Sequence, residues 1–246
     1  MREHVHHLVE TNHVDLLVIN VENAAGGFGV TPAICEELFE LGADVLTTGN
    51  HVWDKKEIND YLASAGNGSS ARRVLRPANY PSKAPGHGDY EGMTRAGVAY
   101  AVLNLQGRVF MIHNDCPFRT ADRLLEQIKA KVILVDFHAE ATSEKVAMGW
   151  YLDGRVTAVL GTHTHVPTAD TRVLTKGTAY QTDVGMTGPY DSVIGVEKEQ
   201  VLARFLTSMP GRFDAARGDV RLNGVLIHCD PQTGRANAIE RIMLGQ

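Results

Sequence analysis

Short apolar runs alternate with amphipathic stretches over the first two thirds of the chain. The runs at residues 15–21, 45–48, 132–137 and 156–160 are largely apolar, as expected of strands buried on both faces. Between them, apolar positions three and four residues apart predict helices at residues 1–12, 32–41, 55–64, 120–131 and 142–152. This alternation predicts an α/β fold with a mostly parallel sheet and helices outside it.

Local signals mark the ends of some of these elements. Thr31 is predicted to cap the second helix, with Pro32 in its first position, and Asp54 is predicted to cap the third. Residues 66–95 are rich in Gly, Pro and Ser, which predicts a long irregular surface segment.

The last part of the chain has a different pattern. Strands are predicted there at residues 178–182 and 224–229, with a helix at 201–206, in addition to a strand at 97–105 in the middle of the chain. Strands gathered toward the C-terminal end predict a second, more antiparallel sheet. No linker separates two self-sufficient halves, so we expect residues 1–246 to form a single domain.

Composition narrows the class of protein. The 246 residues are 43% hydrophobic and 22% charged, which is ordinary for a soluble globular protein. The net charge of −5, without a basic cluster, argues against a broad nucleic-acid surface but leaves room for a small anionic substrate. Three scattered cysteines favour a reducing cytoplasm, and neither a membrane span nor a signal-peptide core is apparent.

Four predicted parallel strands end in residues of metal-binding type. These residues are Glu22 and Asn23, then Asn50 and His51, then His138, and finally His163 and His165. Each alone is more often structural, but parallel strands end at one edge of a sheet, so we expect the seven side chains to lie together. Gly49, just before Asn50, is expected to allow a tight turn.

These residue types suit a pair of metal ions. A carboxylate can bridge two cations, imidazoles suit Fe, Zn and Mn, and amide oxygens add neutral ligands. His163 and His165 are two residues apart, so an extended segment would direct them to the same side. Two metal ions about 3.5–4 Å apart can clamp a phosphate and activate a water, which predicts phosphoester chemistry.

Longer segments carry a family resemblance. ENAAGGFG, TTGNHVWDKKEI, LRPANYP, VDFHAEATSEK, GTHTHVPTAD and TDVGMTGPYDSVIG resemble the YmdB-like family of bacterial metallophosphoesterases, from about residue 15 onward. The resemblance implies a two-sheet α/β/β/α sandwich of the calcineurin-like type and hydrolysis of 2′,3′-cyclic nucleotides. It also implies two metal ions, with iron favoured over Mn, Zn or Mg, and a homo-oligomer.

The resemblance also implies roles for individual residues. Glu22 would bridge the two metals, with Asn23 and His165 on the first metal. Asn50, His138 and His163 would bind the second, and His51 would donate a proton to the leaving oxygen. Arg108 and Asp183 lie in matching motifs and would have supporting roles.

The sequence departs from the family pattern at one point. The family begins with a short strand ending in Gly-Asp, whose Asp binds the first metal, and this sequence contains no such segment. The first metal would then keep only Glu22, Asn23 and His165, and the sheet would lack a central strand. We expect a start site assigned too far downstream or a truncation; the alternative is a natural short form with one metal or none.

Two other functions stay open on the sequence alone. The same site could act on other phosphoesters, such as phosphoproteins or RNA ends. The incomplete metal site is also compatible with a regulator that has no catalytic activity.

Overall fold

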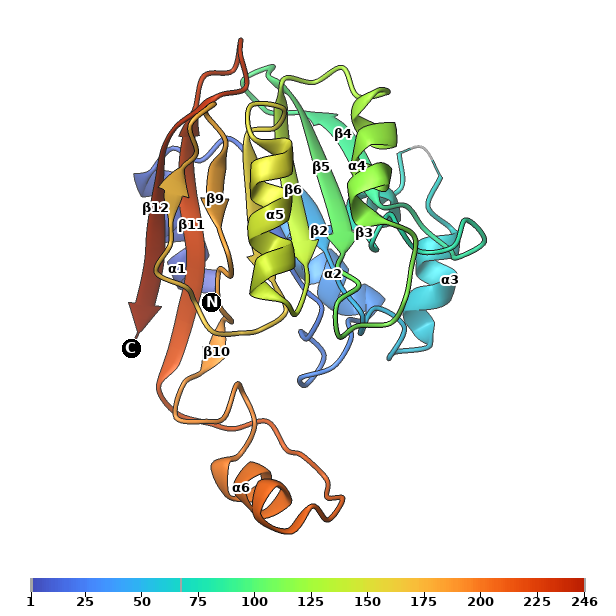
Figure 1. Cartoon of the computed structure of the whole chain (residues 1–246), viewed down its shortest axis with the longest axis vertical. Helices are drawn as coiled ribbons and strands as arrows, with labels where there is room; N and C mark the ends of the chain where they lie inside the picture. The colour runs from blue at the N-terminus through green and yellow to red at the C-terminus, as the bar shows by residue number, and fades with distance from the viewer. Residues whose placement is uncertain (1, 67, 246) are drawn as a thin grey trace.

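The largest of the β-sheets has six strands (Figure 1). The computed structural model describes residues 2–66 and 68–245, and these form three sheets with flanking helices. The six-stranded sheet has the order β4-β5-β6-β7-β9-β8, in which β5, β6, β7 and β9 are parallel and the two edge strands antiparallel. Its strands are β4 (Asp89–Met93), β5 (Ala99–Gln106), β6 (Val132–His138), β7 (Ala158–Thr162), β8 (Arg172–Val173) and β9 (Ala179–Gln181).

The other two sheets have three strands each. One is parallel, with the order β1 (Val18–Asn20), β2 (Val45–Thr47) and β3 (Val74–Leu75). The other is antiparallel, with β10 (Gly188–Pro189), β11 (Val220–Cys229) and β12 (Ala236–Gly245). The expectation that four strands end at one edge of a single sheet is therefore wrong, because β1 and β2 belong to one sheet and β6 and β7 to another.

Helices cover the outer faces of the two sheets that carry these strands. The helices α1 (Arg2–Thr11), α2 (Pro32–Glu40) and α3 (Glu57–Ala63) contribute Val5, Leu38 and Ile58 to an apolar cluster with Leu46 of β2. On the far side lie α4 (Pro117–Leu125) and α5 (Thr142–Leu152), which pack against the six-stranded sheet (Figure 1). A further cluster that includes Val45, Tyr100 and Val102 joins β2 to β5. The α/β class is confirmed.

Buried polar contacts fix the two sheets relative to each other near their carboxyl ends. Asp136 of β6 accepts hydrogen bonds from Asn20 Nδ2 of β1 at 2.8 Å and from Thr47 Oγ1 of β2 at 2.5 Å. Buried carboxylates require such partners, since an unpaired one is strongly disfavoured. The contacts bring the ends of β1 and β2 beside the ends of β6 and β7, so the predicted residues meet across two sheets.

Helix boundaries follow the local signals in part. Thr31 caps α2 as predicted, because its hydroxyl accepts from the Ile34 backbone N–H at 3.3 Å. The prediction for Asp54 is wrong: α3 begins at Glu57, and the Asp54 carboxylate contacts the ring of His51 instead. The helix predicted at 120–131 begins earlier, with Pro117 in its first turn, and ends at Leu125.

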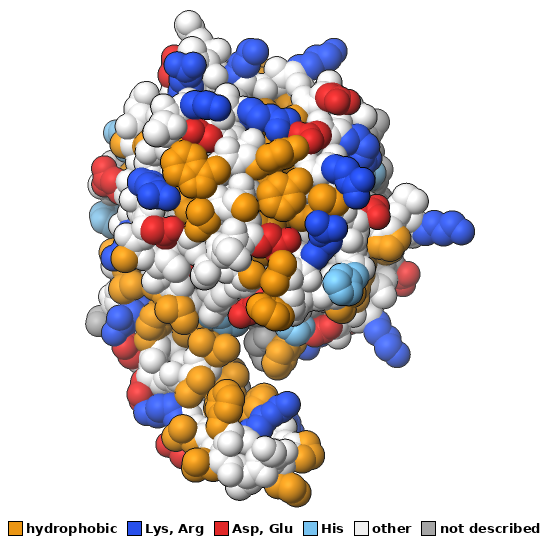
Figure 2. Space-filling model, viewed as in Figure 1, with side chains coloured by type: hydrophobic (Ala, Val, Ile, Leu, Met, Phe, Trp, Pro, Cys, Tyr) orange, Lys and Arg blue, Asp and Glu red, His pale blue; other side chains and the backbone are white. Residues whose placement is uncertain are grey.

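Two regions differ more from the expectation. The segment 66–95 includes a 3₁₀ helix, η1 (Ser70–Arg73), and strands β3 and β4, so its prediction as irregular is wrong in part. The helix predicted at 201–206 is α6 (Lys198–Thr207), on an arm that projects away from the sheets (Figure 1). Figure 2 shows hydrophobic side chains on this arm, where Phe205 and Leu206 are 80% and 84% exposed. Within the described part of the chain, no helix has the length and apolar character needed to cross a membrane.

Candidate metal centre

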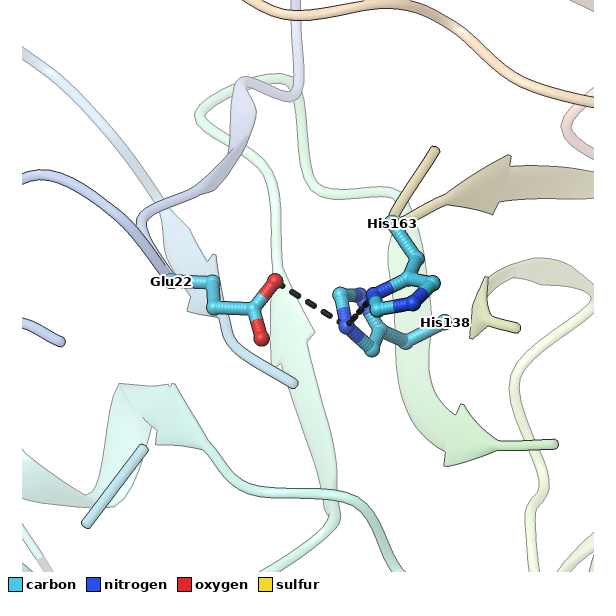
Figure 3. Close-up of side chains that lie close together, drawn as sticks. All are labelled: Glu22, His138 and His163. Carbon is cyan, nitrogen blue, oxygen red and sulfur yellow. Dashed lines mark hydrogen bonds and ion pairs between the residues drawn. The ribbon is translucent and has the colours of Figure 1, made fainter. Parts of the chain in front are cut away.

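Acceptor atoms converge on one ring nitrogen where the strand ends meet. His138 Nε2 at the end of β6 lies 3.0 Å from Glu22 Oε2, 2.9 Å from Asn50 Oδ1 and 3.0 Å from His163 Nδ1. Figure 3 shows Glu22, His138 and His163 turned toward one another from separate elements. Their potential ligand atoms all lie within 4.8 Å of one another, a spacing that suits a metal ion.

The network behind His138 determines which ring nitrogen carries the proton. The Thr162 hydroxyl donates to Asp136 Oδ1 at 2.7 Å, so it accepts from His138 Nδ1 at 2.9 Å. With one hydrogen on Nδ1, Nε2 either carries a second proton, which it donates to the Glu22 carboxylate at 3.0 Å, or presents its lone pair to a metal ion. The separations of 3.0 Å from Glu22 Oε2 and 2.9 Å from Asn50 Oδ1 need either a proton on Nε2 or a metal ion bound by these atoms. This arrangement fits a metal ion, with Thr162 and Asp136 behind its ligand.

His163 and His165 are oriented in the same manner. His163 Nε2 lies 3.1 Å from Glu140 Oε2, which leaves Nδ1 to face His138. His165 Nδ1 donates to the Ile194 carbonyl at 3.1 Å, which leaves Nε2 to face Asn23 Nδ2, also at 3.1 Å. Burial, followed by the charge of His138, lowers the pKa of His163 to about 4, so the ring is neutral as a metal ligand must be.

The second group of predicted ligands is less complete. The structure brings Asn23 and His165 together, beside Glu22 in the sequence. The Asn23 Oδ1 atom is buried and has no hydrogen-bond partner among the described residues. A buried amide oxygen without a donor is costly unless a ligand covers it, so this atom also fits a cation.

Glu22 has the charge that a metal site requires. The residue is 2% exposed, and burial alone would raise its pKa. The charge and hydrogen bond of His138, with the backbone N–H of His51 donating at 3.0 Å, outweigh burial and hold the pKa at about 2. Glu22 is therefore an ionised carboxylate that faces the convergent acceptors.

His51 lies outside the group of convergent atoms, next to Asn50. Its ring is 32% exposed, and Nδ1 lies 2.8 Å from Asp54 Oδ2. The carboxylate orients the ring, while Nε2 remains open to a substrate. The His51 ring thus lies beside the convergent atoms and is not one of them.

A buried ion pair holds the segment that carries His163 and His165. Both residues have positive φ angles, 98° and 69°, which are unusual for residues other than glycine. Between them, Thr164 donates from its backbone N–H at 3.0 Å and from its hydroxyl at 2.7 Å to Asp183 Oδ2, which also accepts from Lys145 Nζ at 2.7 Å. Sequence reasoning singled out Asp183 but missed Lys145, because a lysine on a helix is usually exposed.

Arg108 and Gly49 have roles that differ from the sequence expectation. The Arg108 backbone N–H donates to the Glu144 carboxylate at 3.1 Å, and Arg108 does not join the cluster. A Cβ atom on Gly49 would collide with the His138 ring nitrogen. Gly49 is therefore needed for the close approach of His138, and its φ is not in the left-handed region.

We expect Thr162→Val to lower metal affinity about 10–100-fold, because loss of the partner behind a ligating histidine typically has an effect of this size. The hydroxyl that orients His138 is removed while the side-chain volume is kept. Equilibrium dialysis followed by metal analysis measures the affinity. Thr162→Ser retains the hydroxyl and should bind metal like the unchanged protein; equal loss in both variants would contradict the orienting role.

The fold and the site define an α/β protein with a carboxylate and imidazole cluster, of a kind that could hold a metal ion, between two sheets. The chain belongs to the YmdB-like protein family, whose sequence profile matches residues 1–242. Among solved structures, it resembles a hypothetical protein from Thermus thermophilus, with a TM-score of 0.90 and 45% identity over 100% of this chain and 92% of that one.

Relatives with assigned activities extend this result. The chain is 49% identical over 246 residues to the 2′,3′-cyclic-nucleotide 2′-phosphodiesterase of Bacillus subtilis (strain 168), covering 99% of this chain and 90% of that protein. A crystal structure of a phosphatase from Mycoplasma pneumoniae matches with a TM-score of 0.90 and 33% identity, over 99% of this chain and 87% of that one. The chain is accordingly a hydrolytic phosphoesterase.

Proposed function

We propose that the protein is a metal-dependent phosphodiesterase that hydrolyses 2′,3′-cyclic nucleotides. The observation that carries the proposal is the convergence of Glu22, Asn50, His163 and His138 Nε2, with the unligated His51 beside them. The substrate class is that of the B. subtilis relative, which is named for this activity. The proposed architecture is the two-sheet sandwich of the calcineurin-like phosphoesterases.

The ligand assignment follows the two groups of side chains. Glu22 would bridge two metal ions, Asn50, His138 and His163 would hold one, and Asn23 and His165 would hold the other. We favour iron, the metal that the family resemblance implies, and the mixed nitrogen and oxygen donors of the site are of a type that binds iron. Bound ions would supply a Lewis acid for the phosphate oxygens and lower the pKa of a water.

The remaining chemistry belongs to side chains of the protein. The ionised Glu22 would offset part of the positive charge of bound metal ions. Thr162 and Asp136 keep His138 in the tautomer that presents Nε2. His51 gives the proton from Nε2 to the ribose 2′ oxygen as the bond to phosphorus breaks, and Asp54 keeps the ring in place.

The product of hydrolysis tests this proposal. We expect the metal-loaded protein to convert 2′,3′-cyclic AMP to adenosine 3′-phosphate, with activity removed by a chelator and restored by added metal ions. Chromatography separates the 3′ and 2′ isomers. Hydrolysis of phosphomonoesters alone would favour the phosphatase activity named for the Mycoplasma relative, and no turnover with metal bound would favour a regulator.

A further inference from the structure

A large aromatic side chain is exposed beside the proton donor. Phe28 is 42% exposed, and its ring centroid lies 5.2 Å from that of His51, with an angle of 70° between the rings. Nearby apolar residues such as Val30 and Val52 are fully buried. Phe28 belongs to none of the four apolar clusters formed by the described residues, so it has no evident role in the core.

The loop that carries Phe28 packs against the turn that carries His51. Gly27 and Gly29 on either side have φ angles of 100° and 72°, and the Gly29 carbonyl accepts from the Ala25 backbone N–H at 2.9 Å. A Cβ atom on Gly29 would lie 3.2 Å from Asp54 Cβ and 3.3 Å from the His51 carbonyl oxygen. The loop is thus packed on the turn that carries His51, which places the Phe28 ring against the His51 ring.

We propose that Phe28 is the nucleobase subsite of this enzyme, where the base of the cyclic nucleotide stacks on the exposed ring. The inference rests on the proposed function, and ribose geometry gives the reason. The leaving oxygen is attached to C2′ and the base to the adjacent C1′. A base therefore lies next to whichever group donates a proton to the 2′ oxygen. Phe28 is the ring in contact with that group, His51.

Stacking suits this position for energetic reasons. An exposed aromatic face leaves apolar surface in water, and a base that covers it removes that surface from water on both partners. Because every base has a π-face, such contacts tolerate different bases. The subsite thus favours nucleotides over base-free cyclic phosphates, and purines over pyrimidines through their larger stacking area.

Two substrates and two variants test the subsite. The substrates are 2′,3′-cyclic AMP and ribose 2,3-cyclic phosphate, which lacks the base. Phe28→Leu keeps an apolar side chain but removes the aromatic face, and Phe28→Trp keeps the face. We expect Phe28→Leu to raise KM for cyclic AMP about tenfold, or about 1.4 kcal/mol, within the range for base stacking. Its kinetics on the base-free compound should not change, and Phe28→Trp should retain a low KM for cyclic AMP.

The possible results of these kinetic measurements distinguish failure of the subsite proposal from failure of the proposed function. An unchanged KM for cyclic AMP in Phe28→Leu would overturn the subsite and leave the phosphodiesterase activity standing. Equal losses on both substrates would also overturn it, because they would show a role in holding His51 rather than the base. If the unchanged protein hydrolyses neither compound, the proposed function fails and the subsite fails with it.

Discussion

Replacing His138 with alanine should remove bound metal and lower kcat/KM for 2′,3′-cyclic AMP by about 10³-fold or more. Removing only the hydrogen-bond partner of a ligating histidine commonly lowers metal affinity or activity about 10–100-fold. The His138→Ala substitution removes the ligand itself, so we expect a larger loss. His138 Nε2 is also the atom that contacts Glu22, Asn50 and His163. Its removal therefore deletes the contact that these three side chains share. Metal analysis of the purified variant and steady-state kinetics measure both effects.

The matched control is another histidine of the same chain. His228→Ala changes an exposed residue on β11 and should keep both metal and turnover. Circular dichroism establishes that both variants are folded. A folded His138→Ala protein with full metal content and normal kcat/KM would contradict the central position given to His138.

Replacing His51 with alanine should leave metal binding intact and lower kcat for 2′,3′-cyclic AMP about 10²–10⁴-fold, the usual contribution of a general acid. The ring lies outside the convergent acceptors, and its contacts are with Asp54 and Phe28. Only its backbone N–H reaches Glu22, and that group survives the substitution. The predicted effect is therefore on proton transfer and not on the metal centre.

The leaving group distinguishes proton donation from other roles of His51. The leaving group of a nitrophenyl phosphodiester departs as nitrophenolate without needing a proton. His51→Ala should therefore hydrolyse this diester at a rate close to that of the unchanged protein. The 2′ oxygen of ribose is a poor leaving group and should show the full loss. Equal losses on both substrates would argue that His51 positions the phosphate instead.

The sequence predicts which strand ends carry candidate ligands better than it predicts how those strands are arranged. Apolar runs followed by Glu22, Asn50, His138 and His163 marked the strand ends, because ligand-type side chains are poor core residues. The structure distributes these ends over two sheets, and contacts between distant residues, such as Asn20 with Asp136, determine how the sheets meet. The periodicity of apolar residues indicates only which face of a helix or strand is buried. It does not indicate how two sheets pack against each other.

The supporting residues were the hardest to predict. Thr162 lies within a strand, and its role depends on the simultaneous approach of Asp136 and His138. Gly49 was expected to allow a turn, while the structure shows that the missing side chain makes room for His138. In both cases the function of a residue arises from a neighbour far away in the sequence.

The most direct test of the metal centre is anomalous diffraction from crystals of the metal-loaded protein. We predict a peak between Glu22, Asn50, His138 and His163 and a second one beside Asn23 and His165, with Glu22 between them. Thr162→Val should weaken the first peak. Crystals grown with excess iron or manganese that show no peak at His138 Nε2, in a protein that still hydrolyses 2′,3′-cyclic AMP, would contradict the metal-dependent mechanism.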